Sequence, residues 1–316
     1  MTLSPPKLID LIDSRIVCCY LYPISRYGYP PPASDTVRYL EEMKALGFQS
    51  VELEGIREEH LMDVLRNEKA IVDGLREMEM NIPYFCVVLP GLSSPDAVER
   101  ERNLSLLEEG CELAVRLGAK GVLDNGPVPP YVFDTDVPVA RHFDEDVLGS
   151  GRIPGELRWS VYWEDLVATF REVCDVAAQH GLTYQIHPCT GVLTATSDGF
   201  LRFHDAVGRD NLRFNFDTAN LFLHRENLTV ALLKLAGLID YVHVSDNDGV
   251  RAGHLVPGDG AIRWDAFFET LDRIGFDGHI GLDIGGAETD LGDLDSSYRR
   301  AADWLSERWI KSKLAE

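Results

Sequence analysis

Short runs of β-branched and aromatic residues alternate with longer amphipathic segments along the whole chain. Such a run, bounded by polar residues or glycine, is typical of a buried strand, and apolar residues spaced three and four apart are typical of a helix. The pattern predicts eight strands, at 16–20, 50–54, 84–89, 121–125, 183–187, 213–217, 241–245 and 279–283. The clearest helices between them are predicted at 36–46, 95–117, 164–180 and 265–274.

The ends of these helices are marked by capping residues. The helix at 95–117 is predicted to begin with Ser94 as its cap and Pro95 in its first turn, and to stop at Gly118. The other three are predicted to stop at glycines as well, at Gly47, Gly181 and Gly275.

Eight strand and helix repeats without a hairpin signal favour a parallel sheet closed into an α/β (β/α)8 TIM barrel. We expect one domain over residues 1–316, with a long loop at 126–159 after the fourth strand. An open doubly wound sheet is the alternative. It is disfavoured because the first strand-to-helix junction, at 21–35, lacks the GxGxxG pattern that would bind a dinucleotide.

The composition narrows the range of partners. The 316 residues include 30 Lys and Arg against 52 Asp and Glu, a formal charge of −22, which disfavours nucleic acid and anionic membrane surfaces as partners. No segment reads as a signal peptide or as a membrane span. The six cysteines form no CxxC pair. We therefore expect a soluble, reduced, cytoplasmic protein.

Polar residues stand at or near the carboxyl ends of the predicted strands, where a barrel gathers them at one mouth. Carboxylates together with imidazole suit a divalent ion such as Mn²⁺, Mg²⁺, Co²⁺ or Zn²⁺. A single aspartate at a strand end is more often a helix cap, but four strands in register favour a metal site. The residues are Asp124, Gln185, His187, Asp217, His243, Asp246 and Asp283.

Four sequence blocks resemble the xylose-isomerase-like sugar isomerases and epimerases. They are QIHP at 185–188, NFDTANLFLHREN at 215–227, YVHVSD at 241–246, and HLVPGDG followed by GFDGHIGLD between 254 and 283. The resemblance implies a TIM barrel with a divalent metal at its mouth, and Arg251 and His187 near the substrate. It also implies metal ligands at Gln185, Asp217, His243 and Asp283.

Two of these positions depart from the family pattern. Relatives carry Glu where this chain has Gln185 and where it has Asp283. A Gln carbonyl can ligate a hard ion, but it cannot take up a proton, so only Asp283 remains of the usual pair of carboxylate bases. His187 could replace the missing base, donate to a sugar hydroxyl, or itself bind the metal while Gln185 holds a substrate hydroxyl.

Further residues are candidates for holding the substrate. His142 in the long loop and His254 before PGDG could serve as substrate clamps or bases, and Asp124 could contact the substrate. Glu52 could project into the barrel as a substrate-binding or supporting group, or form a salt bridge. Few Lys or Arg close the predicted strands, which favours an unphosphorylated sugar.

These observations predict a divalent-metal-dependent isomerase or epimerase that abstracts a proton beside the carbonyl of an unphosphorylated sugar or keto-sugar, with Mn²⁺ as the first choice of metal. A keto-sugar lyase or dehydratase, or an enzyme that cleaves 3-keto-glycosides or C-glycosides, is an alternative. A sugar-binding protein without catalysis is a second one. The segment 300–316 is predicted as a terminal helix that could mediate a homo-oligomer or close the barrel.

Overall fold

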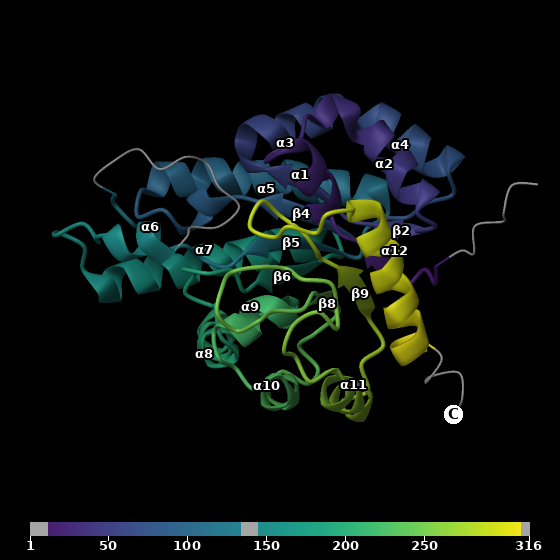
Figure 1. Cartoon of the computed structure of the whole chain (residues 1–316). Coiled ribbons are helices and arrows are strands. Elements are labelled where there is room, and N and C mark those ends of the chain that lie inside the picture. Colours follow the sequence, from purple (N-terminus) through teal and green to yellow (C-terminus); the bar gives the residue numbers. More distant parts are fainter. Residues whose placement is uncertain (1–11, 134–144, 311–316) are drawn as a thin grey trace, which may run out of the picture.

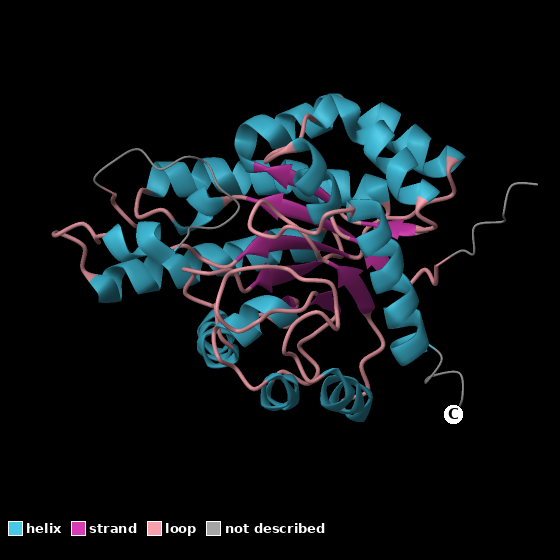
Figure 2. Ribbon diagram, in the orientation of Figure 1, coloured by secondary structure: helices cyan, strands magenta, loops and turns pink. Residues whose placement is uncertain are grey.

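A ring of parallel strands encloses the centre of the computed structural model, which describes residues 12–133 and 145–310 (Figure 2). The strands of this part of the chain are β1 (Ile16–Cys18), β2 (Ser50–Val51), β3 (Leu53–Ile56), β4 (Tyr84–Val88), β5 (Gly121–Asn125), β6 (Thr183–His187), β7 (Leu212–Asp217), β8 (Tyr241–Val244) and β9 (His279–Leu282). Their order is β2-β1-β9-β8-β7-β6-β5-β4-β3. Only Glu52 separates β2 from β3, so these two form one barrel strand. The predicted (β/α)8 barrel is confirmed.

Helices cover the outside of the strands (Figure 1). The four helices predicted most clearly are present, although α7 begins earlier than expected, at Trp159. The helices are α1 (Leu21–Tyr27), α2 (Thr36–Ala45), α3 (Arg57–Arg66), α4 (Glu68–Glu77), α5 (Ala97–Leu117), α6 (Glu145–Ser150), α7 (Trp159–Gln179), α8 (Ser197–Val207), α9 (Thr218–Leu223), α10 (Leu228–Lys234), α11 (Trp264–Arg273) and α12 (Leu294–Leu305). The predicted terminal helix thus starts at Leu294 rather than at residue 300.

The start of α5 differs from the prediction, whereas its end agrees. Asp96 is the cap, and its carboxylate accepts a hydrogen bond from the Val98 amide at 2.8 Å. The Ser94 hydroxyl instead accepts from the Asp96 amide and donates to Glu99. The prediction of Ser94 as the cap was wrong because Asp96 lies next to the first turn. Gly118 ends the helix in the left-handed conformation, with φ of 80°.

Alternate residues of each strand point into the barrel and stack in layers. In the middle layer the Cys19 thiol lies 3.4 Å from the Tyr241 hydroxyl. The Tyr241 ring stacks on that of Tyr84 with centroids 4.4 Å apart. A Cβ atom on Gly281 would lie 2.4 Å from Cys19 Sγ, so only glycine fits there. This packing forms a solid floor beneath the barrel mouth.

Two features expected from the composition can be followed in the structure. All six cysteines are free and buried, which agrees with reduced thiols that behave as small apolar residues. Across residues 12–133 and 145–310, every helix is too short or too polar to cross a bilayer.

Candidate active site

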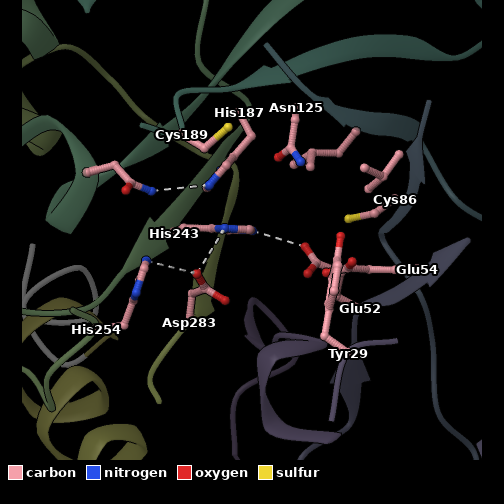
Figure 3. Close-up of a pocket in the computed structure, with 13 residues that line it drawn as sticks. Tyr29, Glu52, Glu54, Cys86, Asn125, His187, Cys189, His243, His254 and Asp283 are labelled. Carbon is pink, nitrogen blue, oxygen red and sulfur yellow. Dashed lines mark hydrogen bonds and ion pairs between the residues drawn. The ribbon is translucent and has the colours of Figure 1, made fainter. Parts of the chain in front are cut away.

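A cavity of about 480 Å³, open solvent at its entrance included, lies at the carboxyl ends of the strands (Figure 3). Barrels carry their chemistry at this end, because the loops that follow the strands converge there. The side chains around it come from most of the strands and from three loops. They are Tyr29, Glu52, Glu54, Cys86, Val88, Leu123, Asn125, His187, Cys189, Asn220, His243, His254 and Asp283.

Five buried side chains form a group that we name the His–Asp cluster: His187, Asp217, His243, His254 and Asp283. Asp217 Oδ2 lies 4.0 Å from His187 Nε2 and 4.0 Å from His243 Nδ1. Asp283 Oδ2 lies 3.9 Å from His243 Nδ1 and 3.7 Å from His254 Nε2. None of the five residues is more than 5% exposed. The fold therefore gathers in one cluster the side chains of residues on β6, β7 and β8, at the end of β9 and in the loop after β8.

The orientation of His187 is fixed by two asparagines. Asn215 donates its amide to the Tyr241 carbonyl at 3.3 Å, so its Oδ1 atom faces His187 Nδ1 at 2.7 Å as an acceptor. His187 Nδ1 therefore carries the proton, and its Nε2 lone pair points into the cluster. The side-chain amide nitrogen of Asn220 lies 3.3 Å from this Nε2 atom. Burial lowers the pKa of His187, which keeps the ring neutral.

Asp217 serves two purposes at the end of β7. It is the cap of α9, and its Oδ1 atom accepts a hydrogen bond from the backbone amide of Asn220 at 2.6 Å. Its second oxygen, Oδ2, has no hydrogen-bond partner within residues 12–133 and 145–310, although the residue is fully buried. Helix capping therefore orients the carboxylate so that its remaining oxygen faces the cluster.

His243 is held from behind by a carboxylate. Its Nε2 atom lies 3.0 Å from Glu52 Oε2, so this nitrogen donates to Glu52 and Nδ1 faces Asp217 and Asp283 (Figure 3). Burial lowers the pKa of His243, but the Glu52, Asp283 and Asp217 carboxylates outweigh burial and raise it to about 9. This arrangement of carboxylate, histidine and open nitrogen is the usual support of a metal ligand.

The cluster fits a divalent metal ion. Buried polar atoms in proteins are normally hydrogen-bonded, yet Asp217 Oδ2 and His243 Nδ1 both lack a hydrogen-bond partner among the described residues. Metal bonds to imidazole nitrogen and carboxylate oxygen are about 2.0–2.2 Å long, so the ligand atoms around one ion lie about 3–4 Å apart. The separations of 3.9–4.0 Å that join Asp217 to His187 and His243, and His243 to Asp283, lie at the upper end of that range.

Gln185 lies deeper in the barrel than the cluster. It pairs in register with Leu123, whereas His187 pairs with Asn125, one inward position nearer the mouth. Its side chain is fully buried. His187 therefore lines the cavity, whereas Gln185 is absent from the wall formed by the described residues, and its role as a metal ligand stays a prediction.

Asp124 points away from the cluster. Its carboxylate accepts hydrogen bonds from the Leu89 amide at 3.2 Å, the Asn125 amide at 2.7 Å and the Tyr184 hydroxyl at 3.0 Å. Burial outweighs these bonds and raises its pKa to about 7. These contacts join the ends of β4, β5 and β6.

The remaining candidate residues from the sequence differ in whether they line the cavity. Glu52 and His254 line it. Arg251 is exposed, and its carbonyl accepts from the Asn247 side chain at 2.9 Å. It is absent from the cavity wall formed by the described residues. His142 lies outside the described residues.

Sequence reasoning missed the residues that orient the ligands. Asn220, three positions after the helix cap Asp217, contacts His187, and Asn215 supports the same ring. The spacing of Asp217 and Asn220 is that of a helix cap and its first turn, so a capping analysis of this block could have placed Asn220 at the mouth.

Comparisons with known proteins support the family and the fold. A family model described as xylose isomerase-like TIM barrel matches residues 40–308. A 2-oxo-tetronate isomerase from Pectobacterium atrosepticum is 26% identical over 283 residues, which cover 86% of this chain and 94% of the isomerase. An inosose dehydratase from Geobacillus thermodenitrificans is 26% identical over 133 residues, which cover 37% of this chain and 45% of the dehydratase.

The fold also matches solved structures. The structure of an L-ribulose 3-epimerase superposes with a TM-score of 0.70 at 19% identity, covering 95% of this chain and 96% of the epimerase. The first curated relatives are matched over 38–49% of their own length.

Proposed function

This chain belongs to the xylose isomerase-like TIM barrel family, and from that premise we propose that it is a divalent-metal-dependent isomerase or epimerase of an unphosphorylated sugar or keto-sugar. The observation that carries the proposal is the pair of buried atoms without hydrogen bonds, Asp217 Oδ2 and His243 Nδ1, at the mouth of the barrel. Relatives that include an isomerase and a dehydratase of sugar-like compounds support the substrate class.

Asp217, His243, Asp283 and His187 would hold the metal. Such an ion, Mn²⁺ in our proposal, would supply Lewis-acid chemistry: it would polarise a carbonyl and offset the negative charge that develops when the adjacent C–H is deprotonated. The sequence left Gln185 and His187 as alternatives for one of these ligands, and we assign it to His187 because His187 lines the cavity and Gln185 does not. Glu52 would hold His243 in the tautomer that presents Nδ1.

The protein's own groups supply the proton transfers. Asp283, one of the carboxylates of the cavity wall, would accept the proton of the substrate, and His254 Nε2 lies 3.7 Å from it. The other nitrogen of His254, Nδ1, lies 3.2 Å from Glu288 Oε1. His254 therefore lies between the Asp283 and Glu288 carboxylates.

The charge of the cavity favours a neutral substrate. The cavity wall formed by the described residues contains three carboxylates, Glu52, Glu54 and Asp283, and no Lys or Arg. A phosphate group would be repelled there, because carboxylates present only acceptors. Sugar hydroxyls can donate to those acceptors.

The first test is elemental analysis of the protein purified without chelator. We expect close to one divalent metal per chain in the wild type, loss of the metal in Asp217→Ala, and retention in Asp124→Asn, a buried aspartate outside the cluster. Keto-sugars are then incubated with the metal-loaded protein in D₂O. The product should keep the mass of the substrate apart from one deuterium. Absence of metal from the wild type, or full turnover by Asp217→Ala, would contradict the proposal.

A lyase is the second candidate, because Gln185 cannot act as a base and the enolate formed by a single base can expel a group at the β carbon. The inosose dehydratase relative supports this alternative. Product analysis on a 3-keto-glycoside separates the two reactions, since elimination releases water or the aglycone and isomerisation conserves the mass. A purely sugar-binding protein would take up metal and ligand without forming either product.

A further inference from the structure

A second cavity adjoins the first one at the barrel mouth. It encloses about 680 Å³, open solvent at its entrance included, and shares Tyr29, Val88, Asn125 and Cys189 with the first cavity. These four residues form a waist between two lobes.

The second lobe differs in character from the first. Its walls include Leu89, Pro90, Val128 and Val192. Asp124 also borders it, but the carboxylate is already engaged by two backbone amides and the Tyr184 hydroxyl. The lobe therefore offers apolar surface beside the acidic, polar lobe that holds the His–Asp cluster.

Arg57 stands at this second lobe in an unusual backbone conformation. It follows β3, begins α3 and has φ of 57°, a left-handed value that costs a non-glycine residue conformational energy. The junction is held by buried His60, whose Nδ1 atom accepts from the Ile56 amide and whose Nε2 atom therefore donates to the Pro31 carbonyl, each at 3.0 Å. A guanidinium stacks well on aromatic faces, so Arg57 and the apolar walls suit a flat aromatic group.

We propose that the second lobe binds an aromatic aglycone, so that the substrate is an aryl glycoside or its keto derivative with the sugar ring in the first lobe; this inference rests on the proposed function. Apolar walls, Arg57 at the border and four residues shared with the polar cavity are features that suit a two-part substrate of this kind. The sugar supplies hydroxyls to the acidic lobe, and the aromatic ring leaves water on entering the apolar lobe.

The test compares two probes that differ only in the aglycone, methyl and phenyl 3-keto-β-D-glucopyranoside. Their binding to the metal-loaded protein is measured by isothermal titration calorimetry. We expect the phenyl compound to bind at least tenfold more tightly. Val128→Trp fills the second lobe and should abolish this preference while binding of the methyl compound stays within about twofold. The matched control is Val132→Trp at a neighbouring exposed position outside the lobe, which should retain the preference.

The role of Arg57 is tested by a pair of glycine substitutions. Arg57→Gly and Glu79→Gly both remove the backbone strain of a non-glycine residue in the left-handed conformation, with φ of 57° and 52°. Both variants should therefore be at least as stable as the wild type in thermal unfolding. Only Arg57→Gly should lower the affinity for the phenyl compound, by about threefold to tenfold, because Glu79 lies before β4, at the other end of the barrel.

The outcomes separate the two proposals. Equal affinity for the methyl and phenyl compounds, or an unchanged preference in Val128→Trp, would overturn the aglycone site and leave the proposed function in place. Failure of both compounds to bind the metal-loaded protein would overturn the keto-sugar proposal and the aglycone site with it.

Discussion

Replacing Glu52 by glutamine removes the negative charge beside His243 while keeping the size of the side chain. Glu52 is 2% exposed, and its Oε2 atom lies 3.0 Å from His243 Nε2. Its other oxygen accepts from the Tyr20 amide at 3.3 Å, a bond that an amide oxygen can keep. Loss of such a supporting carboxylate typically lowers metal affinity about 10–100-fold, which corresponds to about 1.4–2.7 kcal/mol.

The same charge also raises the affinity of His243 for a proton, which competes with the metal. With a pKa of about 9, the metal-free ring is almost fully protonated at pH 7 and must lose that proton before Nδ1 can bind an ion. This competition lowers the metal affinity of the wild type about 100-fold at pH 7 and only about fourfold at pH 8.5, since each pKa unit is a factor of ten. The wild-type affinity should therefore rise about 25-fold between these two pH values.

Glu52→Gln should show a smaller loss of affinity at pH 7 than at pH 8.5, because the variant gives up metal support and proton competition together. Titration calorimetry with Mn²⁺ at both pH values, in two buffers of different ionisation enthalpy, measures affinity and released protons. The wild type should release close to one proton at pH 7 and Glu52→Gln clearly fewer. An affinity for Mn²⁺ that does not change with pH in the wild type, or an equal loss at both pH values in the variant, would refute the reasoning.

Three further predictions concern stability, measured as the free energy of unfolding in urea. The raised pKa of Asp124, about 7, favours its protonated folded form, so this contribution is complete below the unfolded pKa near 4 and is lost as the pH rises through 7. The stability of Asp124→Asn relative to the wild type should consequently increase by about 3 kcal/mol between pH 5 and 7.5, and no change would contradict the burial argument. Asp246→Ala should cost about 3 kcal/mol, because the Gly258 and Ile262 amides and the Trp264 indole lose their acceptor. Gly281→Ala should cost about 1–3 kcal/mol through overpacking of the barrel floor, and a stability equal to the wild type would show that the floor can relax.

Much of the fold and part of the site could be predicted from the sequence alone. The eight strands follow from local runs of β-branched and aromatic residues, and parallel strands in a barrel all end at one mouth. That rule is sufficient to bring Asp217, His243 and Asp283 together, since each stands within a few residues of a strand end. The start of α5 was predicted less well, because Ser94 and Asp96 are both good caps and their competition is decided by the loop before the helix.

The supporting residues were decided by tertiary structure. Glu52 contacts His243 across 191 positions of sequence, and His254 reaches Asp283 from a loop whose path no periodicity describes. A salt bridge from Glu52 to a neighbouring arginine was an open alternative, and the structure instead gives Glu52 a buried histidine, His243, as its partner.

The choice between Gln185 and His187 shows what the sequence predicts and what only the closed barrel decides. Alternation along a strand turns both side chains into the barrel, and the sequence alone predicts this. Which of the two stands level with Asp217 and His243 depends on the stagger of β6 against its neighbours, a property of the closed sheet. The sequence by itself determined the strands, the inward faces and the residues at the strand ends. The heights of those residues in the barrel, and the loops that cover them, were decided only when all eight strands closed into one ring, because register is a relation between strands that no single segment contains.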